Sequence, residues 1–145
     1  MWIFKKNQLF YQGLGLFCLM LMIILRPGLT KADATASLYF IPTSGSYQVN
    51  SEFSVRLVVQ SDASINLTES TINFSTDTLT VTGISKTGSC LSLWFSEPQY
   101  SNNDGTISFS GGIPNPGFTG LGRILTINLK AKAKGAAWLK IRSIS

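Results

Sequence analysis

Histidine is absent from the 145-residue chain, and cysteine occurs only twice. Without histidine the chain cannot form a Ser-His-Asp triad, a Cys-His pair or a histidine-ligated zinc site. Two cysteines are also too few for a four-thiolate metal site. Charged residues make up only 13% of the chain and apolar residues 44%, so we expect a folded or membrane-inserted chain rather than a disordered one. The length is that of a single domain.

The first 34 residues have the order of a secretory signal peptide. Two lysines precede an apolar run over residues 13–25, and a Pro-Gly pair and the small-residue sequence Ala32-Asp33-Ala34 follow it. This order predicts cleavage before Thr35. The alternative is an uncleaved hydrophobic helix that anchors the chain in a membrane, which the two basic residues after the run favour. In both cases we expect residues 35–145 to be exported, outside the cell or at its surface, and to meet a membrane only through the leader.

Removal of the leader changes the charge and the cysteine count. Four of the twelve basic residues and one of the seven acidic residues lie in it, so residues 35–145 carry a net charge of +2. Cys90 is the one cysteine left, and an intrachain disulfide is therefore excluded. No basic stretch is interleaved with aromatic residues, so we predict no nucleic-acid partner.

Residues 35–145 alternate between apolar and polar side chains, as half-buried strands do. Residues 53–60 and 125–133 show the pattern most clearly, and Asp104-Gly105 is typical of a hairpin turn. The Gly- and Pro-rich segment 111–122 predicts a long loop. About eight strands at this spacing predict an all-β, two-sheet β-sandwich.

Four segments, in this order, resemble the cohesin domain family. They are SYQVNSEFSVRLVV at 46–59, INFSTDTLTVTGI at 72–84, DGTISF at 104–109 and GLGRILTINLKAKA at 120–133. Where the family commonly has Tyr-Asp, this chain has Phe74-Ser75. The resemblance implies a nine-stranded jelly-roll sandwich over residues 35–145. It also implies a non-catalytic role in which a dockerin-bearing partner, often a polysaccharide-degrading enzyme, is held on a sheet face.

Trp94 and Trp138 are candidate ligand-binding residues. If Leu93 and Phe95 point inward, Trp94 points outward. If Leu139 and Ile141 point inward, Trp138 points outward as well. Exposed tryptophan is common in protein-binding hot spots, and its ring also stacks on sugars. The alternative is that other segments cover the two rings, or that the alternation is shifted by one residue.

Lys130 and Lys132 are further candidates, together with Lys134, Lys140 and Arg142. The alternation places all five on the outward side of two strands that we expect to be adjacent, where they could meet an acidic partner. The alternative is a solvated face, or edge protection by lysine.

No catalytic or metal site is predicted. Glu69, Glu97 and Asp104 are the best carboxylates, but nothing in their spacing pairs two of them, as a glycosidase requires. The segment 102–105 lacks the spacing of a calcium loop. We therefore expect a binding module without a cofactor that attaches a dockerin-like protein in a polysaccharide-associated setting. The alternatives are a carbohydrate-binding module that uses exposed aromatic residues, and a structural surface or adhesin subunit.

Overall fold

A computed structural model of the chain describes residues 36–144, which form eight strands and no helix. The strands are β1 (Ala36–Ile41), β2 (Glu52–Ile65), β3 (Leu67–Phe74), β4 (Leu79–Ser85), β5 (Leu93–Ser101), β6 (Thr106–Gly112), β7 (Phe118–Ala131) and β8 (Leu139–Ile144). Across this range no helix is long and apolar enough to cross a membrane. The expected leader, residues 1–34, lies outside the described residues, so the signal peptide and the domain boundary stay predictions.

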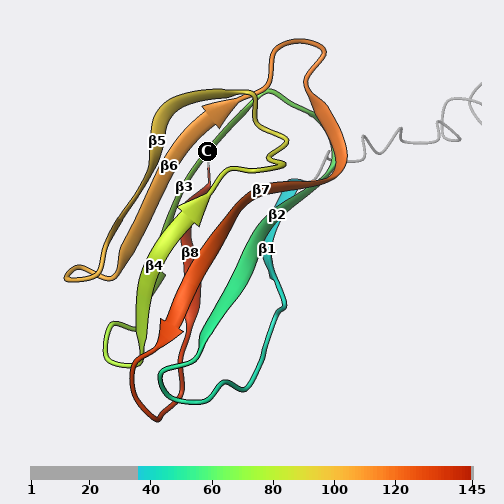
Figure 1. Ribbon diagram of the computed structural model, residues 1–145. Helices are drawn as coiled ribbons and strands as arrows, with labels where there is room; N and C mark the ends of the chain where they lie inside the picture. Colours follow the sequence, from blue (N-terminus) through green and yellow to red (C-terminus); the bar gives the residue numbers. More distant parts are fainter. Residues whose placement is uncertain (1–35, 145) are drawn as a thin grey trace, which may run out of the picture. The chain divides into compact units, whose positions relative to one another are not determined.

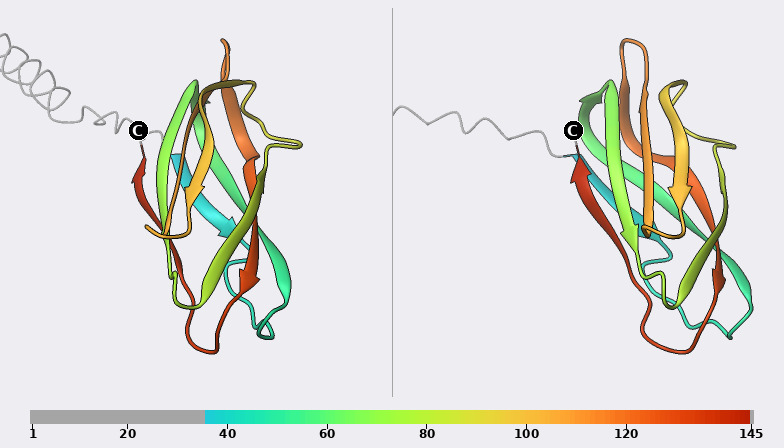
Figure 2. Two further views of the ribbon diagram at one scale, coloured as in Figure 1. Left: turned by 60° about the vertical axis from the view of Figure 1, so that its left-hand side comes forward. Right: turned by 90° about the vertical axis from the view of Figure 1, so that its left-hand side faces the viewer.

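The strands form two stacked antiparallel sheets of four strands each (Figure 1). The first sheet has the order β1-β2-β7-β4 and the second sheet the order β5-β6-β3-β8. Figure 2 shows the two layers from two other sides. The expected all-β sandwich is confirmed. The resemblance implied nine strands, whereas residues 36–144 form eight.

Alternating side chains from both sheets fill the space between the layers. On the first sheet Val55 pairs with Ile127, and on the second sheet Ile72 pairs with Ile107. All four side chains are buried in one apolar cluster. Each large apolar side chain that is buried in this way contributes about 1.5–3 kcal/mol to stability, and this core holds the sheets together without a disulfide.

A β-bulge in β7 adds a core residue that strict alternation does not predict. Leu57 pairs with Leu125, but the next residue, Val58, pairs with Arg123, so Ile124 has no partner on β2. Ile124 and Leu125 are consecutive, and both are buried. The bulge therefore turns two successive side chains toward the core.

A single residue, Asn66, connects the two sheets between β2 and β3. Its carbonyl oxygen accepts a hydrogen bond from the Ile113 N–H at 2.8 Å, and its side-chain amide donates to the Asn115 side-chain oxygen at 2.9 Å. The loop after β6 is thereby tied to this corner. It spans only residues 113–117, so the prediction of a loop over 111–122 was wrong at both ends. Its glycines misled the prediction, because several of them lie within strands.

The predicted hairpin turn at Asp104-Gly105 is confirmed between β5 and β6. Gly105 has a φ of 64°, which glycine adopts without steric cost. Asn102 in the same turn reaches across to the first sheet. Its Oδ1 accepts from the Val81 N–H at 2.8 Å, and its Nδ2 donates to the Val81 carbonyl at 3.0 Å. One side chain therefore occupies both main-chain groups of Val81 on β4.

Candidate functional site

The outer face of the second sheet is polar over most of its area. On β3, the buried side chains of Thr68, Ser70 and Ile72 point inward, so the residues between them point outward. Their neighbours on β6 and β5 follow from the strand pairing. The outward set on these three strands consists mainly of hydroxyl and amide side chains: Glu69, Thr71, Asn73, Thr106, Ser108, Ser110, Ser96, Gln99 and Ser101.

Three apolar side chains gather at one end of this polar face. Leu67 lies opposite Gly112, which lies opposite Leu93, and Phe95 is the extra residue of a bulge in β5. Leu67 is 53% exposed, Leu93 47% and Phe95 66%. A Cβ added to Gly112 would lie 3.0 Å from the Phe95 ring, so the glycine leaves room for this ring on the sheet. We call Leu67, Leu93 and Phe95 the Phe95 cluster.

Trp94 points inward, which corrects the prediction for β5. It packs against the core, and its ring meets that of Phe109 edge to face, with the centroids 6.2 Å apart. The alternation correctly predicted that Trp94 points away from Leu93 and Phe95. It was wrong about which of these side chains face the core. Gly111 pairs with Trp94, and a Cβ at Gly111 would lie 2.7 Å from the Leu93 carbonyl oxygen and 2.9 Å from the Leu91 side chain, so only glycine fits at this position. Leu93 and Phe95 are left outside.

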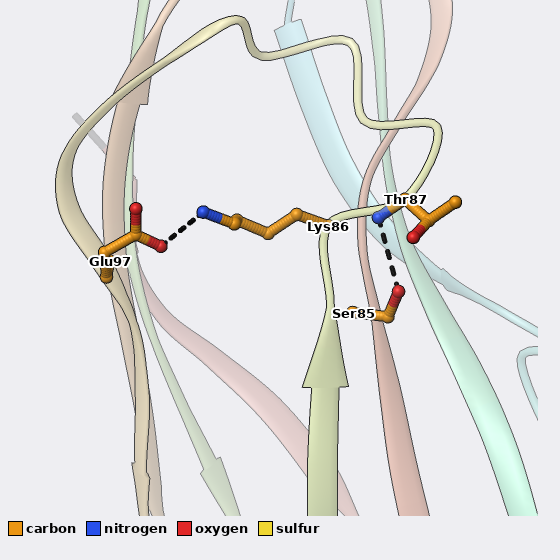
Figure 3. Close-up of polar contacts among 4 residues, drawn as sticks. All are labelled: Ser85, Lys86, Thr87 and Glu97. Carbon is orange, nitrogen blue, oxygen red and sulfur yellow. Dashed lines mark hydrogen bonds and ion pairs between the residues drawn. The ribbon is translucent and has the colours of Figure 1, made fainter.

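Lys86 lies at the edge of the sandwich beside Trp94 and contacts the second sheet. Its Nζ lies 2.5 Å from the Glu97 Oε2 (Figure 3). The same Nζ lies 5.2 Å from the centroid of the Trp94 ring. Just beyond the end of β4, the Thr87 N–H donates to the Ser85 hydroxyl at 3.3 Å. The contacts of Lys86 with Glu97 and Trp94 join the end of β4 in the first sheet to β5 in the second sheet.

Trp138 is 43% exposed, as the alternation predicted, and lies just before β8. The Lys140 Nζ lies 5.1 Å from the centroid of its ring. Trp138 borders a cavity of about 590 Å³ between the two sheets, which Phe40, Phe53 and Leu139 also line. Trp94 packs against Phe109, whereas Trp138 borders this cavity, so the two tryptophans do not form one aromatic surface.

The five basic residues do not share one sheet face, which corrects the second prediction. β7 belongs to the first sheet and β8 to the second, so Lys130 and Lys140 lie on different layers. Lys132 and Lys134 are exposed in the connection between them. The error arose because strands that follow one another in the chain were taken as neighbours in one sheet. Lys132 Nζ donates to the Thr76 carbonyl at 3.3 Å.

The surroundings of Glu97, Asp104 and the Cys90 thiol do not favour catalysis. Glu97 is paired with Lys86, and the Asp104 carboxylate accepts from the Ser101 hydroxyl at 2.6 Å. Partial burial raises the pKa of the Cys90 thiol, an effect that its main-chain hydrogen bonds reduce. The thiol is therefore neutral at pH 7 and a poor nucleophile. Within residues 36–144 no group of three acidic, cysteine or histidine side chains could hold a metal ion.

Comparison with solved structures identifies the fold. The third cohesin of ScaC from Acetivibrio cellulolyticus, solved with the ScaB dockerin, matches with a TM-score of 0.52 and 21% identity, over 66% of this chain and 73% of that chain. A non-cellulosomal cohesin from the archaeon Archaeoglobus fulgidus matches with a TM-score of 0.60 and 14% identity, over 77% and 76%. A type I cohesin–dockerin complex from Clostridium thermocellum matches with a TM-score of 0.60 and 12% identity, over 77% and 84%.

The domain has a cohesin-like fold. Identities of 12–21% support the shared fold and leave the function to be argued from the residues themselves. No protein-family profile and no curated protein matches the chain. The cohesin-like fold was predicted from the four sequence segments. The Phe95 cluster was not, because its members come from different strands and two of them were expected inside.

Proposed function

We propose that this cohesin-like domain is a non-catalytic protein-binding module that holds its partner on the outer face of the second sheet. The observation that carries the proposal is the Phe95 cluster. Its three large apolar side chains are about half or more exposed on an otherwise polar sheet. Contiguous exposed apolar side chains with a polar surround are typical of protein-binding sites.

The cohesin-like fold supports one partner class. Two of the similar structures are complexes of a cohesin with a dockerin. A dockerin-type module is therefore the partner we propose, in a polysaccharide-associated setting outside the cell or at its surface. The predicted leader supports this location, because it would export the domain.

The test is a binding titration between the full 145-residue chain, kept in mild detergent, and type I dockerin modules. Phe95→Ser removes the largest member of the cluster, and we expect it to weaken binding by about tenfold or more, as for a hot-spot residue. Leu121→Ser is the matched control, because Leu121 is 59% exposed on β7 of the first sheet. This control should bind like the unchanged chain.

Equal binding by the Phe95 and Leu121 variants would contradict the proposed face. Failure of every dockerin to bind, with retention of the chain on insoluble polysaccharide that Trp138→Ala abolishes, would favour a carbohydrate-binding module instead. Thermal unfolding of the Phe95 and Leu121 variants should match that of the unchanged chain, because both substituted side chains are exposed.

A further inference from the structure

The cavity beside Trp138 lies at one end of the sandwich, away from the Phe95 cluster. Leu139 of its wall pairs with Phe74 at the end of β3, whereas Leu67 of the Phe95 cluster lies at the start of β3. The connections between β1 and β2 and between β7 and β8 form much of its wall, and both lie at this end (Figures 1 and 2). Its volume of about 590 Å³ lies within the range of about 300–1,000 Å³ that is common for small-molecule sites. The cavity is therefore large enough for a ligand and separate from the proposed dockerin face.

Aromatic rings form one part of the cavity wall, and two of them reach the surface. Tyr47 and Trp138 both line the cavity and are each 43% exposed, so the cavity opens to solvent. Tyr47 stacks on Phe53 with the ring centroids 3.6 Å apart, which fixes its position in the wall. Lys140 contacts the Trp138 ring but does not line the cavity, so this contact leaves the cavity side of the indole uncovered. An accessible aromatic ring of this kind can stack on the C–H face of a sugar ring.

Polar groups form another part of the wall. The segments 42–47 and 133–138 lie between strands, and within the described chain no main-chain hydrogen bond joins residues 43–47 or 133–137 to another segment. Thr43, Ser44 and Ser46 add hydroxyl groups to the same wall. Main-chain N–H and C=O groups and hydroxyls that have no partner in the protein can bind the hydroxyl groups of a ligand.

The wall favours an uncharged ligand, because none of the described residues that line the cavity is charged. Charged residues of both signs, with the basic ones in excess, adjoin lining residues in the sequence but do not line the cavity themselves: Glu52, Arg56, Asp77, Lys130, Lys132, Lys134 and Lys140. A charged group inside the cavity would therefore lose its hydration without gaining an ion pair.

We propose that the cavity beside Trp138 is a second binding site, which takes the sugar rings of a neutral oligosaccharide or of the end of a neutral polysaccharide chain. The C–H face of one sugar ring stacks on the Trp138 indole, and its hydroxyl groups bind the free main-chain groups of residues 43–47 and 133–137. An apolar ligand would leave these polar groups without partners. The site does not depend on the proposed dockerin face, so one domain has room for a partner protein and a glycan together.

The first test is a calorimetric titration of the full 145-residue chain with neutral tetrasaccharides of β-1,4-linked glucose, xylose or mannose. The chain is kept in a mild detergent whose headgroup is not a sugar. We expect saturable binding of at least one of these tetrasaccharides. A tetrasaccharide of galacturonic acid, which has the same length but carries carboxylates, should bind at least about tenfold more weakly.

Two substitutions of Trp138 separate stacking from simple filling of the cavity. Trp138→Phe keeps an aromatic ring, and we expect the affinity for the neutral tetrasaccharide to fall by no more than about threefold. Trp138→Leu keeps an apolar side chain without a ring, and we expect a fall of about tenfold or more. Both variants lose the same indole, so their unfolding temperatures should agree, and the difference in affinity then reports the ring.

Two sources of the sugar are distinguished by retention of the chain on insoluble cellulose, xylan or mannan. Retention would identify a polysaccharide chain as the ligand, whereas binding of a tetrasaccharide without retention would identify free oligosaccharides, and both results support the proposal. Phe95→Ser is the matched control, because it removes an exposed aromatic ring elsewhere and should leave sugar binding unchanged. Trp138→Leu should in turn leave dockerin binding unchanged, so the two sites can fail separately.

Three results would overturn the proposal. They are no binding of any of the neutral tetrasaccharides, binding of the galacturonic acid tetrasaccharide that is at least as tight, and equal affinities of the Trp138→Phe and Trp138→Leu variants for the neutral sugar.

Discussion

The two edges of the first sheet differ in how deeply their inward side chains are buried. Leu79 and Val81 on β4 are 3% and 1% exposed, whereas Leu38 and Phe40 on β1 are only partly buried. On the β4 side, the Asn102 amide and the Lys86 contacts join the first sheet to the second. On the β1 side no described segment does so. The direction in which a side chain points is thus determined by its own strand. How deeply it is buried depends on residues from other strands and loops that cover the edge.

The sharpest test of this difference is one substitution made at both edges. Leu79→Ala leaves a cavity at the covered edge, and we expect a loss of about 2–5 kcal/mol in the free energy of unfolding. Leu38→Ala removes a side chain that water already reaches in part, and we expect a loss of about 1–2 kcal/mol. Urea unfolding measures both. Equal losses would mean that β1 is covered as completely as β4.

Removal of the Asn102 amide should open the covered edge without changing its apolar residues. Asn102→Ala deletes both hydrogen bonds to Val81, and we expect a loss of about 1 kcal/mol and faster hydrogen exchange at the Val81 N–H. Asn103→Ala, in the same turn, is the control and should leave both quantities unchanged. Unchanged exchange in the Asn102 variant would show that another group protects the edge.

The Lys86–Glu97 ion pair should contribute least. Its side chains are 39% and 62% exposed, so a double-mutant cycle with Lys86→Gln and Glu97→Gln should give a coupling of about 0.2–1 kcal/mol. Added salt should reduce this coupling. A coupling that salt does not change would indicate that Lys86 acts on the edge through its packing against Trp94 instead.

The fold followed from local patterns where each strand was regular. The alternation of β2 and the Asp104-Gly105 turn were read correctly, because both depend on neighbouring residues alone. The bulge at Ile124 was missed, since it depends on how β2 and β7 pair. β7 and β8 were expected to be adjacent, and only the pairing of β8 with β3 shows that they belong to different sheets.

The candidate sites were harder to predict for the same reason. The alternation predicts that Trp94 points away from Leu93 and Phe95, but it does not predict which face of the strand packs on the core. That choice depends on how β5 pairs with the neighbouring strand, where the bulge at Phe95 leaves this ring beside Gly112 on the outer side. The exposure of Trp138 was predicted correctly. The cavity beside it was not predicted, because it combines segments from both sheets that are distant in the sequence.

The places of the two ends of the described chain, beside the Asn66 corner, determine how the domain would respond to mechanical tension. Ala36 pairs with Ser61 near the end of β2, and Ile144 pairs with Ser70 near the start of β3, so both ends of the described chain lie toward this corner (Figure 2). A force applied between these ends peels β1 and β8 from the sandwich one residue pair at a time. The pairing of β2 with β7 and of β3 with β6, which holds the core, bears load only after both outer strands have detached.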